Sequence, residues 1–268
     1  MRFIREKQDL TYLKWSHTRN SSGTAGTFLK SESNLSGTKK YYKLSNYDPV
    51  NGITGHECIN ELIVDRLLTL LGVEHLDYEL IFADVEINGK QYSTCLCSSF
   101  DFKQRGESKI ALDDFYRINA LPDESPYDFC TRHGWQKYID TMLAIDFIIL
   151  NRDRHGANIE VLRNARAHTL RIAPLFDHGL SLLFTCHSDP EAEKFDIMED
   201  KRCQNFIGGT SCLENLKFMK DKPYIFQNRL KESDRDYIFH GLHDVLSKTL
   251  IEKIWCMIYE RYRFYENL

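Results

Sequence analysis

Apolar positions follow two different patterns along the chain, and the change between them separates a first region from a second. Three segments of the first region carry the apolar and aromatic residues typical of short strands. These segments are residues 40–44, 78–86 and 91–100. Asn88-Gly89, between the last two, is a strong hairpin signal. Apolar residues at helical spacing predict one helix over residues 57–71, and Gly72 supplies its stop.

Helical spacing dominates the second region, with one further hairpin. The predicted helices are residues 113–118 and 135–150, and the predicted strands are residues 159–162 and 169–172. Residues 187–232 are polar and irregular. Two capping-box patterns, Ser233 to Asp236 and Thr249 to Glu252, predict where the last helices begin.

The order of these elements predicts an α+β fold of two lobes that share a cleft. We place a small sheet-rich lobe at residues 1–102 and a helical lobe at residues 103–268. Apolar residues make up 42% of the chain and aromatic residues 12%, which is enough for a hydrophobic core and too much for a disordered chain.

Charge and hydropathy narrow the choice of partners. The formal net charge is -4 with both signs mixed throughout, and no basic block indicates direct contact with nucleic acid. No apolar run approaches the ~20 residues of a membrane span, and the charged N-terminus lacks the apolar centre of a signal peptide. The eight cysteines include no Cys-x-x-Cys pair, which disfavours zinc and favours reduced core thiols. We therefore expect a cytoplasmic protein.

The candidate chemistry begins in a polar stretch, Asn151-Arg-Asp-Arg-His-Gly-Ala-Asn158. A carboxylate such as Asp153 can orient an attacking hydroxyl and take its proton, and the amide oxygen of Asn158 suits magnesium. Asp177 ends an apolar strand just before His-Gly, where a carboxylate that bridges metal ions would lie. Taken singly, each is more typical of a loop residue bonded to its own backbone. Jointly, they indicate a kinase.

Lys43 and Glu61 form a second candidate pair. A lysine inside an apolar strand needs a phosphate or a carboxylate as partner, and Glu61 on the following helix can supply one. Kinases hold their phosphate-binding lysine in this way. The alternative is a solvated acidic face, because Glu57 and Asp65 lie in line with Glu61 on the same helix.

A glycine-rich segment lies one strand before Lys43. Gly23-Thr24-Ala-Gly26 offers two glycines and a hydroxyl at a position that favours a phosphate cover. It lacks both the Gly-x-Gly-x-x-Gly pattern and the Gly-Lys-Ser/Thr of a Walker loop, so a plain surface loop is the alternative.

Three further polar residues surround the candidate catalytic stretch. Asp146 breaks the apolar face of its helix, and we expect it to accept hydrogen bonds from the backbone of residues 151–156, with a direct catalytic part as the alternative. His155 and His178 flank the acidic residues. Contact with the metal-binding carboxylates or with nucleotide is favoured there over zinc ligation, which would need a third ligand.

Several of these segments resemble HipA-like serine/threonine kinases, bacterial proteins best known as toxins of toxin–antitoxin pairs. The catalytic motifs that carry the resemblance are Phe147-Ile-Ile-Leu-Asn-Arg-Asp-Arg-His-Gly-Ala-Asn158 and Ala173-Pro-Leu-Phe-Asp-His-Gly-Leu-Ser181. Residues 60–72 resemble the family's helix after the ATP lysine, and Ser98-Ser-Phe-Asp-Phe102 resembles its nucleotide hinge. The chain resembles the short form of the family, without the additional N-terminal subdomain of longer members.

By position, the resemblance implies a site for ATP and Mg²⁺. The implied nucleotide-binding residues are Gly23, Thr24, Gly26, Lys43, Glu61, Ser98, Phe100, Asp101 and His155. Within this set, the backbone from Ser98 to Phe100 would hold adenine, and Asp101 would hold ribose. The implied catalytic base is Asp153, and the implied magnesium ligands are Asn158 and Asp177. Family members silence themselves by phosphorylating their glycine-rich loop, for which the candidates here are Ser21, Ser22 and Thr24.

The predicted function is ATP-dependent phosphorylation of a serine or threonine in a protein substrate. The resemblance implies a cytoplasmic bacterial kinase that acts as a toxin or effector, with an antitoxin as partner; delivery into a host cell is left open.

Two alternative functions stand beside it. A phosphoinositide-type lipid kinase shares the motif Asp-Arg-His-x-x-Asn-Ile, but it favours a basic or apolar membrane-facing loop, whereas residues 187–232 are mixed and contain several acids. A pseudokinase or nucleotide-binding module would lack Asp153, Asn158, Asp177 or Lys43, and all four are present.

Overall fold

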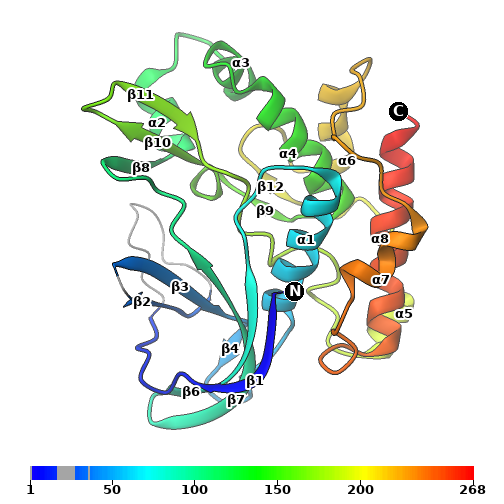
Figure 1. Ribbon diagram of the computed structural model, residues 1–268. Coiled ribbons are helices and arrows are strands. Elements are labelled where there is room, and N and C mark those ends of the chain that lie inside the picture. The colour runs from blue at the N-terminus through cyan, green and yellow to red at the C-terminus, as the bar shows by residue number, and fades with distance from the viewer. Residues whose placement is uncertain (1, 17–27, 36) are drawn as a thin grey trace.

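The computed structural model describes residues 2–16, 28–35 and 37–268, and its first part is a sheet with one long helix (Figure 1). The elements of this part are β1 (Phe3–Asp9), β2 (Lys30–Leu35), β3 (Thr38–Leu44), β4 (Tyr47–Asp48), β5 (Gly52–Ile53), α1 (Glu57–Leu71), β6 (Glu79–Ile87) and β7 (Lys90–Phe100). Five strands form one sheet in the order β1-β6-β7-β3-β2, in which β1 runs parallel to β6 and the other pairs are antiparallel.

The second part is mainly helical, and the predicted α+β fold is confirmed. Its helices are α2 (Leu112–Asn119), α3 (Pro126–Arg132), α4 (Gln136–Ile148), α5 (Asp189–Lys194), α6 (Cys212–Asn215), α7 (Arg235–Ile238) and α8 (Lys248–Glu266), with 3₁₀ turns at Gly156–Asn158, Leu216–Met219 and Glu232–Asp234. Its strands are β8 (Glu107–Ala111), β9 (Asp153–Arg154), β10 (Glu160–Asn164), β11 (Thr169–Ile172) and β12 (Gln204–Asn205). β10 lies between β11 and β8, and β9 pairs with β12.

Local turn chemistry explains the elements that the sequence predicts best. Asn88 and Gly89 both have positive φ, 52° and 78°, as the two-residue hairpin between β6 and β7 requires. α1 spans the predicted residues, and Gly72 after it has φ 69° and donates its N–H to the carbonyls of Leu68 and Thr69. Both predictions are confirmed.

α1 packs into the main hydrophobic core together with α4 and α8. Buried residues of this core include Leu62, Leu67 and Leu68 from α1, Ile145 and Ile148 from α4, and Ile254 and Ile258 from α8. In Figure 1, α1 accordingly lies between the sheet and the C-terminal helices. This packing fixes α1, and every side chain that it carries, relative to the second half of the chain.

The predicted starts of the C-terminal helices are wrong. α8 begins after Ser247, whose hydroxyl accepts a hydrogen bond from the N–H of Leu250 at 3.1 Å, so Thr249 lies inside the helix. At the 3₁₀ turn Glu232–Asp234, the capping side chain is that of Asp234, which accepts a hydrogen bond from the N–H of Lys231 at 2.8 Å. Ser247 is the N-cap because its hydroxyl, two residues before Thr249, already accepts a hydrogen bond from a first-turn N–H.

The cysteines and the apolar segments are compatible with a reduced globular chain. All eight cysteines are free thiols, and six of them are buried. Within the residues that the structure describes, no helix has the length and apolar character to cross a membrane.

Candidate active site

Lys43 lies at the centre of an ion-pair cluster formed by three distant segments. Its ammonium nitrogen is 2.9 Å from Oε1 of Glu61 in α1 and 2.5 Å from Oδ1 of Asp177. The predicted contact between Lys43 and Glu61 is therefore present. The alternative of a solvated acidic face is wrong, because Glu57, Glu61 and Asp65 are all buried.

The cluster keeps Lys43 charged. Burial would lower the pKa of Lys43, but the carboxylates of Asp177 and Glu61 outweigh it and hold that pKa well above its ordinary value. Glu61 also reaches the segment of Asp177, because its Oε2 accepts the backbone N–H of His178 at 2.8 Å. One glutamate thus binds the lysine and the backbone next to the second acid.

Asp177 has an uncommon backbone conformation that its neighbours support. Its φ is 59°, in the left-handed region that residues with a Cβ adopt rarely. Its N–H donates to the hydroxyl of Tyr78 at 3.2 Å, and the carbonyl before it, that of Phe176, accepts from Nη1 of Arg154 at 2.8 Å. Together with the bond from His178 to Glu61, three side chains from separate segments hold this turn.

The segment from Asn151 to Asn158 forms a compact loop around Asp153. β9 pairs with β12 on one side, and a 3₁₀ turn ends at Asn158. The amide nitrogen of Asn158 donates to the carbonyl of Asp153 at 2.9 Å and lies 3.5 Å from its Oδ2. Gly156 is tightly placed, because an added Cβ would lie 2.4 Å from Cβ of Asp113 in α2. The loop therefore fixes Asp153 and Asn158 relative to each other.

Asp146 supports this loop through side chains rather than through the expected backbone N–H groups. Its Oδ1 accepts from Nδ2 of Asn151 at 2.9 Å, and both of its oxygens accept from the guanidinium of Arg154, at 2.9 to 3.3 Å. The only hydrogen bond from that backbone to this residue in the described chain goes from the N–H of Asn151 to the main-chain carbonyl. The expected partners were wrong because a buried arginine competes better than neutral N–H groups for a buried carboxylate.

A cavity of about 1000 Å³ opens beside the ion-pair cluster. Its walls come from β3, from the end of β7, from β8 and from the segment around Asp177. Lining residues that bear on the candidate site are Lys43, Tyr78, Ser98, Phe100, Lys109, Ala157, Glu160, Phe176 and Asp177. Among the predicted residues, Gly23, Thr24, Gly26, Ser21 and Ser22 lie outside the described part of the chain.

The strand pairing of the predicted hinge, residues 98–102, changes along its length. β6 begins at Glu79 opposite Ser98, so its ladder with β7 does not extend to Ser99 and Phe100, which line the cavity. Asp101 is not among the lining residues. Its Oδ1 accepts the N–H of Lys103 and lies 3.1 Å from the ammonium of Lys109, so it is engaged within the hinge itself. The structure thus brings the backbone of the hinge to the cavity, and it holds Asp101 against Lys109, which lines the cavity.

The two histidines occupy different environments. Nδ1 of His155 accepts the N–H of Ala157 at 3.2 Å, and its Nε2 lies 3.6 Å from Oδ1 of Asp153. His178 is buried beside Glu61, with 3.9 Å between Nδ1 and Oε2, and burial holds its pKa well below the ordinary value. His155 therefore neighbours the candidate base, and His178 is a neutral part of the packing under the cluster.

A separate His–Asp group lies outside this site. Among the described residues, the carboxylates of Asp65 and Asp77 come close enough to His75 to share a metal ion. The guanidinium of Arg2 already joins these two carboxylates, at 2.8 and 2.5 Å. A cationic side chain thus takes the place that a metal ion would need.

The donor set near the cavity fits a hard divalent cation. Asp177 offers carboxylate oxygens, and Asn158 offers an amide oxygen, since its amide nitrogen binds the Asp153 carbonyl. Mg²⁺ prefers oxygen ligands from a few protein groups together with substrate phosphates. The residues present are therefore of the right kind to hold Mg²⁺.

Sequence reasoning missed several residues of this site. Tyr78 and Lys109 line the cavity, the latter with its ammonium 4.0 Å from the ring centre of Phe102. Arg154 is fully buried behind the loop. A lone tyrosine before a strand or a lone lysine within one carries no periodic signal. Arg154 could have been suspected, because Asp146 needed a buried partner.

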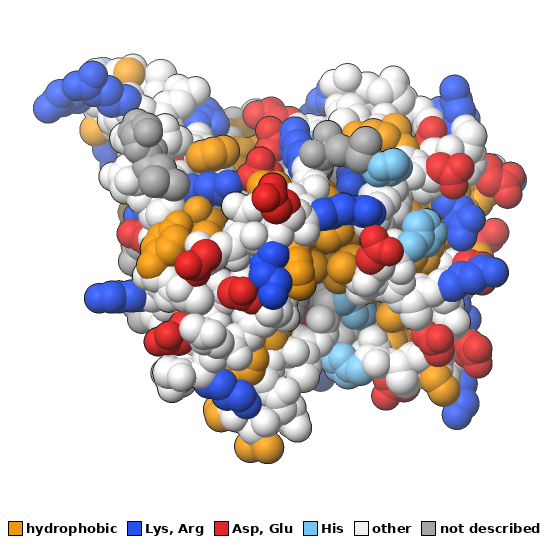
Figure 2. Space-filling model, turned by 60° about the horizontal axis from the view of Figure 1, so that its bottom comes forward, with side chains coloured by type: hydrophobic (Ala, Val, Ile, Leu, Met, Phe, Trp, Pro, Cys, Tyr) orange, Lys and Arg blue, Asp and Glu red, His pale blue; other side chains and the backbone are white. Residues whose placement is uncertain are grey.

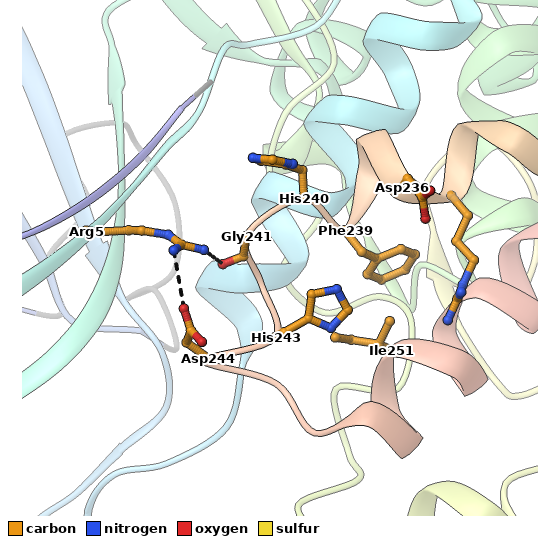
Figure 3. A pocket seen from close by; sticks show the side chains of 9 residues that line it. Arg5, Asp236, Phe239, His240, Gly241, His243, Asp244 and Ile251 are labelled. Atoms are coloured by element: carbon orange, nitrogen blue, oxygen red, sulfur yellow. Dashed lines mark hydrogen bonds and ion pairs between the residues drawn. The ribbon is translucent and has the colours of Figure 1, made fainter.

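The face of the molecule drawn in Figure 2 shows no dominant charge. In Figure 2, acidic and basic side chains are interspersed over the face that is shown. A second cavity, of about 590 Å³, lies between β1 and the start of α8 (Figure 3). Arg5 crosses its edge, donating to the carbonyl of Gly241 at 2.7 Å and lying 3.4 Å from Asp244. None of the predicted site residues lines this cavity.

Comparison with known proteins identifies the fold. No family model matches the chain, and no curated protein matches it in sequence. Among solved structures, the chain is similar to the Helicobacter pylori proinflammatory kinase CtkA, with a TM-score of 0.61, 17% identity and coverage of 96% of this chain and 95% of that chain. The two chains share a fold. The resemblance to HipA-like kinases is thereby confirmed at the level of the fold.

A second solved structure is more distant. A chain of the Shewanella oneidensis MR-1 toxin–antitoxin complex of HipA, HipB and operator DNA aligns with a TM-score of 0.43 and 12% identity. The alignment covers 93% of this chain and 59% of that chain. Similarity at this level does not by itself establish a common fold.

Proposed function

We propose that the chain is a kinase that transfers the γ-phosphate of ATP to a serine or threonine hydroxyl of a protein. The observation that carries the proposal is the contact of Lys43 with both Glu61 and Asp177 at the wall of the large cavity. One strand of the sheet (β3), one helix (α1) and the turn after β11 meet at this ammonium group. Such a lysine can neutralise a phosphate while the carboxylates keep it charged and in place.

The chain's own residues divide the remaining work. Asp153 would orient the attacking hydroxyl and accept its proton, and its side chain is one-quarter exposed, which leaves it accessible to a substrate. Asn158 and Asp177 would hold Mg²⁺. Bound there, the metal would neutralise charge on the transferring phosphate. Positioning and charge neutralisation, without a covalent intermediate, are sufficient for this reaction.

The nucleotide would lie in the large cavity, between the proposed lobes at residues 1–102 and 103–268. At Ser99 and Phe100, β7 pairs with β3 but no longer with β6, so its β6-facing side would offer backbone groups for adenine. Asp101 would hold the ribose, because it lies 3.1 Å from the ammonium of Lys109, which lines the cavity, and stands between the lining residues Phe100 and Phe102.

Incorporation of radiolabelled phosphate tests the proposal. The purified chain is incubated with γ-labelled ATP and Mg²⁺ and a Ser/Thr-rich protein mixture, beside the variant Asp153→Ala. Label in the wild type and none in the variant is expected. Equal incorporation of label by the wild type and Asp153→Ala would contradict the mechanism. No incorporation by either protein would favour a nucleotide-binding module.

Autophosphorylation and the substrate need separate measurements. Intact mass after incubation with Mg-ATP should show added phosphate on Ser21, Ser22 or Thr24, and an unchanged mass would count against this part of the proposal. Phosphoproteomics after induction, with Asp153→Ala as the control, would identify the substrate.

A toxin role in the bacterial cytoplasm, with an antitoxin partner, rests on the family resemblance alone. Growth arrest on induction, relieved by co-expression of a neighbouring gene, is the expected result. Normal growth with an active kinase would remove this part and leave the phosphotransfer proposal intact.

A further inference from the structure

One buried arginine joins three parts of the candidate site. Arg154 is fully buried, and its Nε and Nη2 atoms bind the carboxylate of Asp146 in α4. Its Nη1 points to the other side, where it donates to the carbonyl of Phe176 at 2.8 Å and to the carbonyl of Asn158 at 3.3 Å. The guanidinium is thus anchored to α4 and binds the two loop segments that contain Asn158 and Phe176.

Both carbonyls belong to the candidate metal-binding segments. Asn158 is itself a candidate ligand, and the carbonyl of Phe176 belongs to the peptide group that enters Asp177. The left-handed conformation of Asp177 is unfavourable for a residue with a Cβ, so it persists only where neighbours hold it. A bond to the preceding carbonyl restricts that peptide group directly.

We propose that Arg154 is a positioning residue that sets the separation between Asn158 and Asp177 and thereby determines metal affinity. The inference rests on the proposed function, since it concerns the same metal site. An arginine is required because its planar fork can bind a carboxylate with one edge and two carbonyls with the opposite nitrogen. A lysine presents a single ammonium and cannot span both sides.

The chain contains a matched control for the loss of a buried arginine. Arg261 in α8 is 1% exposed and donates to the carbonyls of Phe147, Ile197 and Glu199, at 3.0, 2.7 and 2.8 Å. None of these carbonyls belongs to a candidate ligand or to a residue next to one. Arg261→Lys therefore removes a comparable number of buried hydrogen bonds without touching Arg154 or a candidate ligand, although one of the carbonyls, that of Phe147, follows Asp146 in α4.

The experiment measures metal affinity directly. Mn²⁺ binding in the presence of a non-hydrolysable ATP analogue is followed by electron paramagnetic resonance for the wild type, Arg154→Lys and Arg261→Lys, with melting temperatures in parallel. We expect Mn²⁺ affinity to fall at least tenfold in Arg154→Lys and to change less than twofold in Arg261→Lys, although both lose thermal stability. In phosphate-transfer assays, high Mg²⁺ should partly restore Arg154→Lys.

A second variant guards against a folding failure. Asp146→Asn keeps the shape of the residue that anchors Arg154 and should weaken Mn²⁺ binding in the same direction, by a smaller factor. The inference would be overturned if Arg154→Lys and Asp146→Asn both bound Mn²⁺ with wild-type affinity. If Arg154→Lys does not fold, wild-type affinity of Asp146→Asn alone would overturn it. In either case the proposed function would still stand. A wild type that binds no Mn²⁺ would overturn both.

Discussion

Lys43 and Asp177 lie 134 residues apart in the sequence and form an ion pair of 2.5 Å in the fold. One side chain comes from a central strand of the sheet, and the other comes from a turn after the hairpin of the second half. The contact therefore exists only when both halves are correctly docked. The geometry of the candidate site therefore depends on the relative position of the two halves of the chain.

Removal of the lysine charge should destabilise the chain strongly. Lys43→Met leaves the buried carboxylate of Glu61 facing Asp177 without a cation, and breaking a buried pair in this way costs about 3–5 kcal/mol. Urea unfolding at pH 7 measures the loss. The double variant Lys43→Met/Glu61→Gln removes the stranded charge and should recover part of it, so additive losses from the two substitutions would contradict the central position of the lysine.

Asp153→Asn should separate chemistry from nucleotide binding. Asp153 does not line the large cavity, so the affinity for an ATP analogue should stay within about twofold, whereas the loss of a general base typically lowers kcat by about 10²–10⁴-fold. Fluorescence titration and steady-state kinetics give the two quantities. A variant that loses affinity and keeps kcat would place Asp153 at the nucleotide and not at the hydroxyl.

Predictions from sequence succeed where a few neighbouring residues determine the backbone. The hairpin at Asn88-Gly89 and the end of α1 at Gly72 depend on positive φ angles, which those residue types adopt readily. β1 was missed for the opposite reason. It is an edge strand with four consecutive exposed residues, so no alternation of apolar positions marks it.

In the candidate site, too, local features could be predicted from the sequence and contacts between distant segments could not. The spacings that suggested Asp153, Asn158 and Asp177 are local, and the pairing of a strand lysine with a helical glutamate follows from the need to satisfy buried charge. Besides the carboxylate of Asp146, Arg154 binds two backbone carbonyls, which every residue has, so no residue type could mark these two partners in advance. Likewise, the contact of Asp101 with Lys109 joins β8 to the hinge across the fold, and no local pattern marks it.

Gly156→Ala should disturb the candidate catalytic loop by overpacking. The new Cβ would lie 2.4 Å from Cβ and 2.5 Å from Cγ of Asp113, which forces the loop or α2 to shift and costs about 1–3 kcal/mol. Chemical denaturation and kcat should both reveal the loss. Asp113→Gly in the same chain removes both clashing atoms and should restore much of it.

A second glycine supplies the control for Gly156→Ala. At Gly209, an added Cβ would meet only Oδ1 of Asn215, at 3.9 Å, so Gly209→Ala should be tolerated. Equal losses at positions 156 and 209 would mean that the backbone freedom of glycine, and not the contact with Asp113, explains the effect.

His56 should make stability fall under mildly acid conditions. Burial, with a smaller effect of His187, lowers the pKa of His56 to about 4, whereas an unfolded histidine has a pKa of about 6.5. The unfolded state therefore takes up the proton first, so the stabilisation is complete above about pH 6.5 and is lost as pH falls toward 4, by about 2 kcal/mol at pH 5. Urea unfolding from pH 7.5 to 5 should show a smaller slope for His56→Asn than for wild type, with His243→Asn, at an exposed position, as the control. Identical slopes for His56→Asn and wild type would show that the buried imidazole is not responsible.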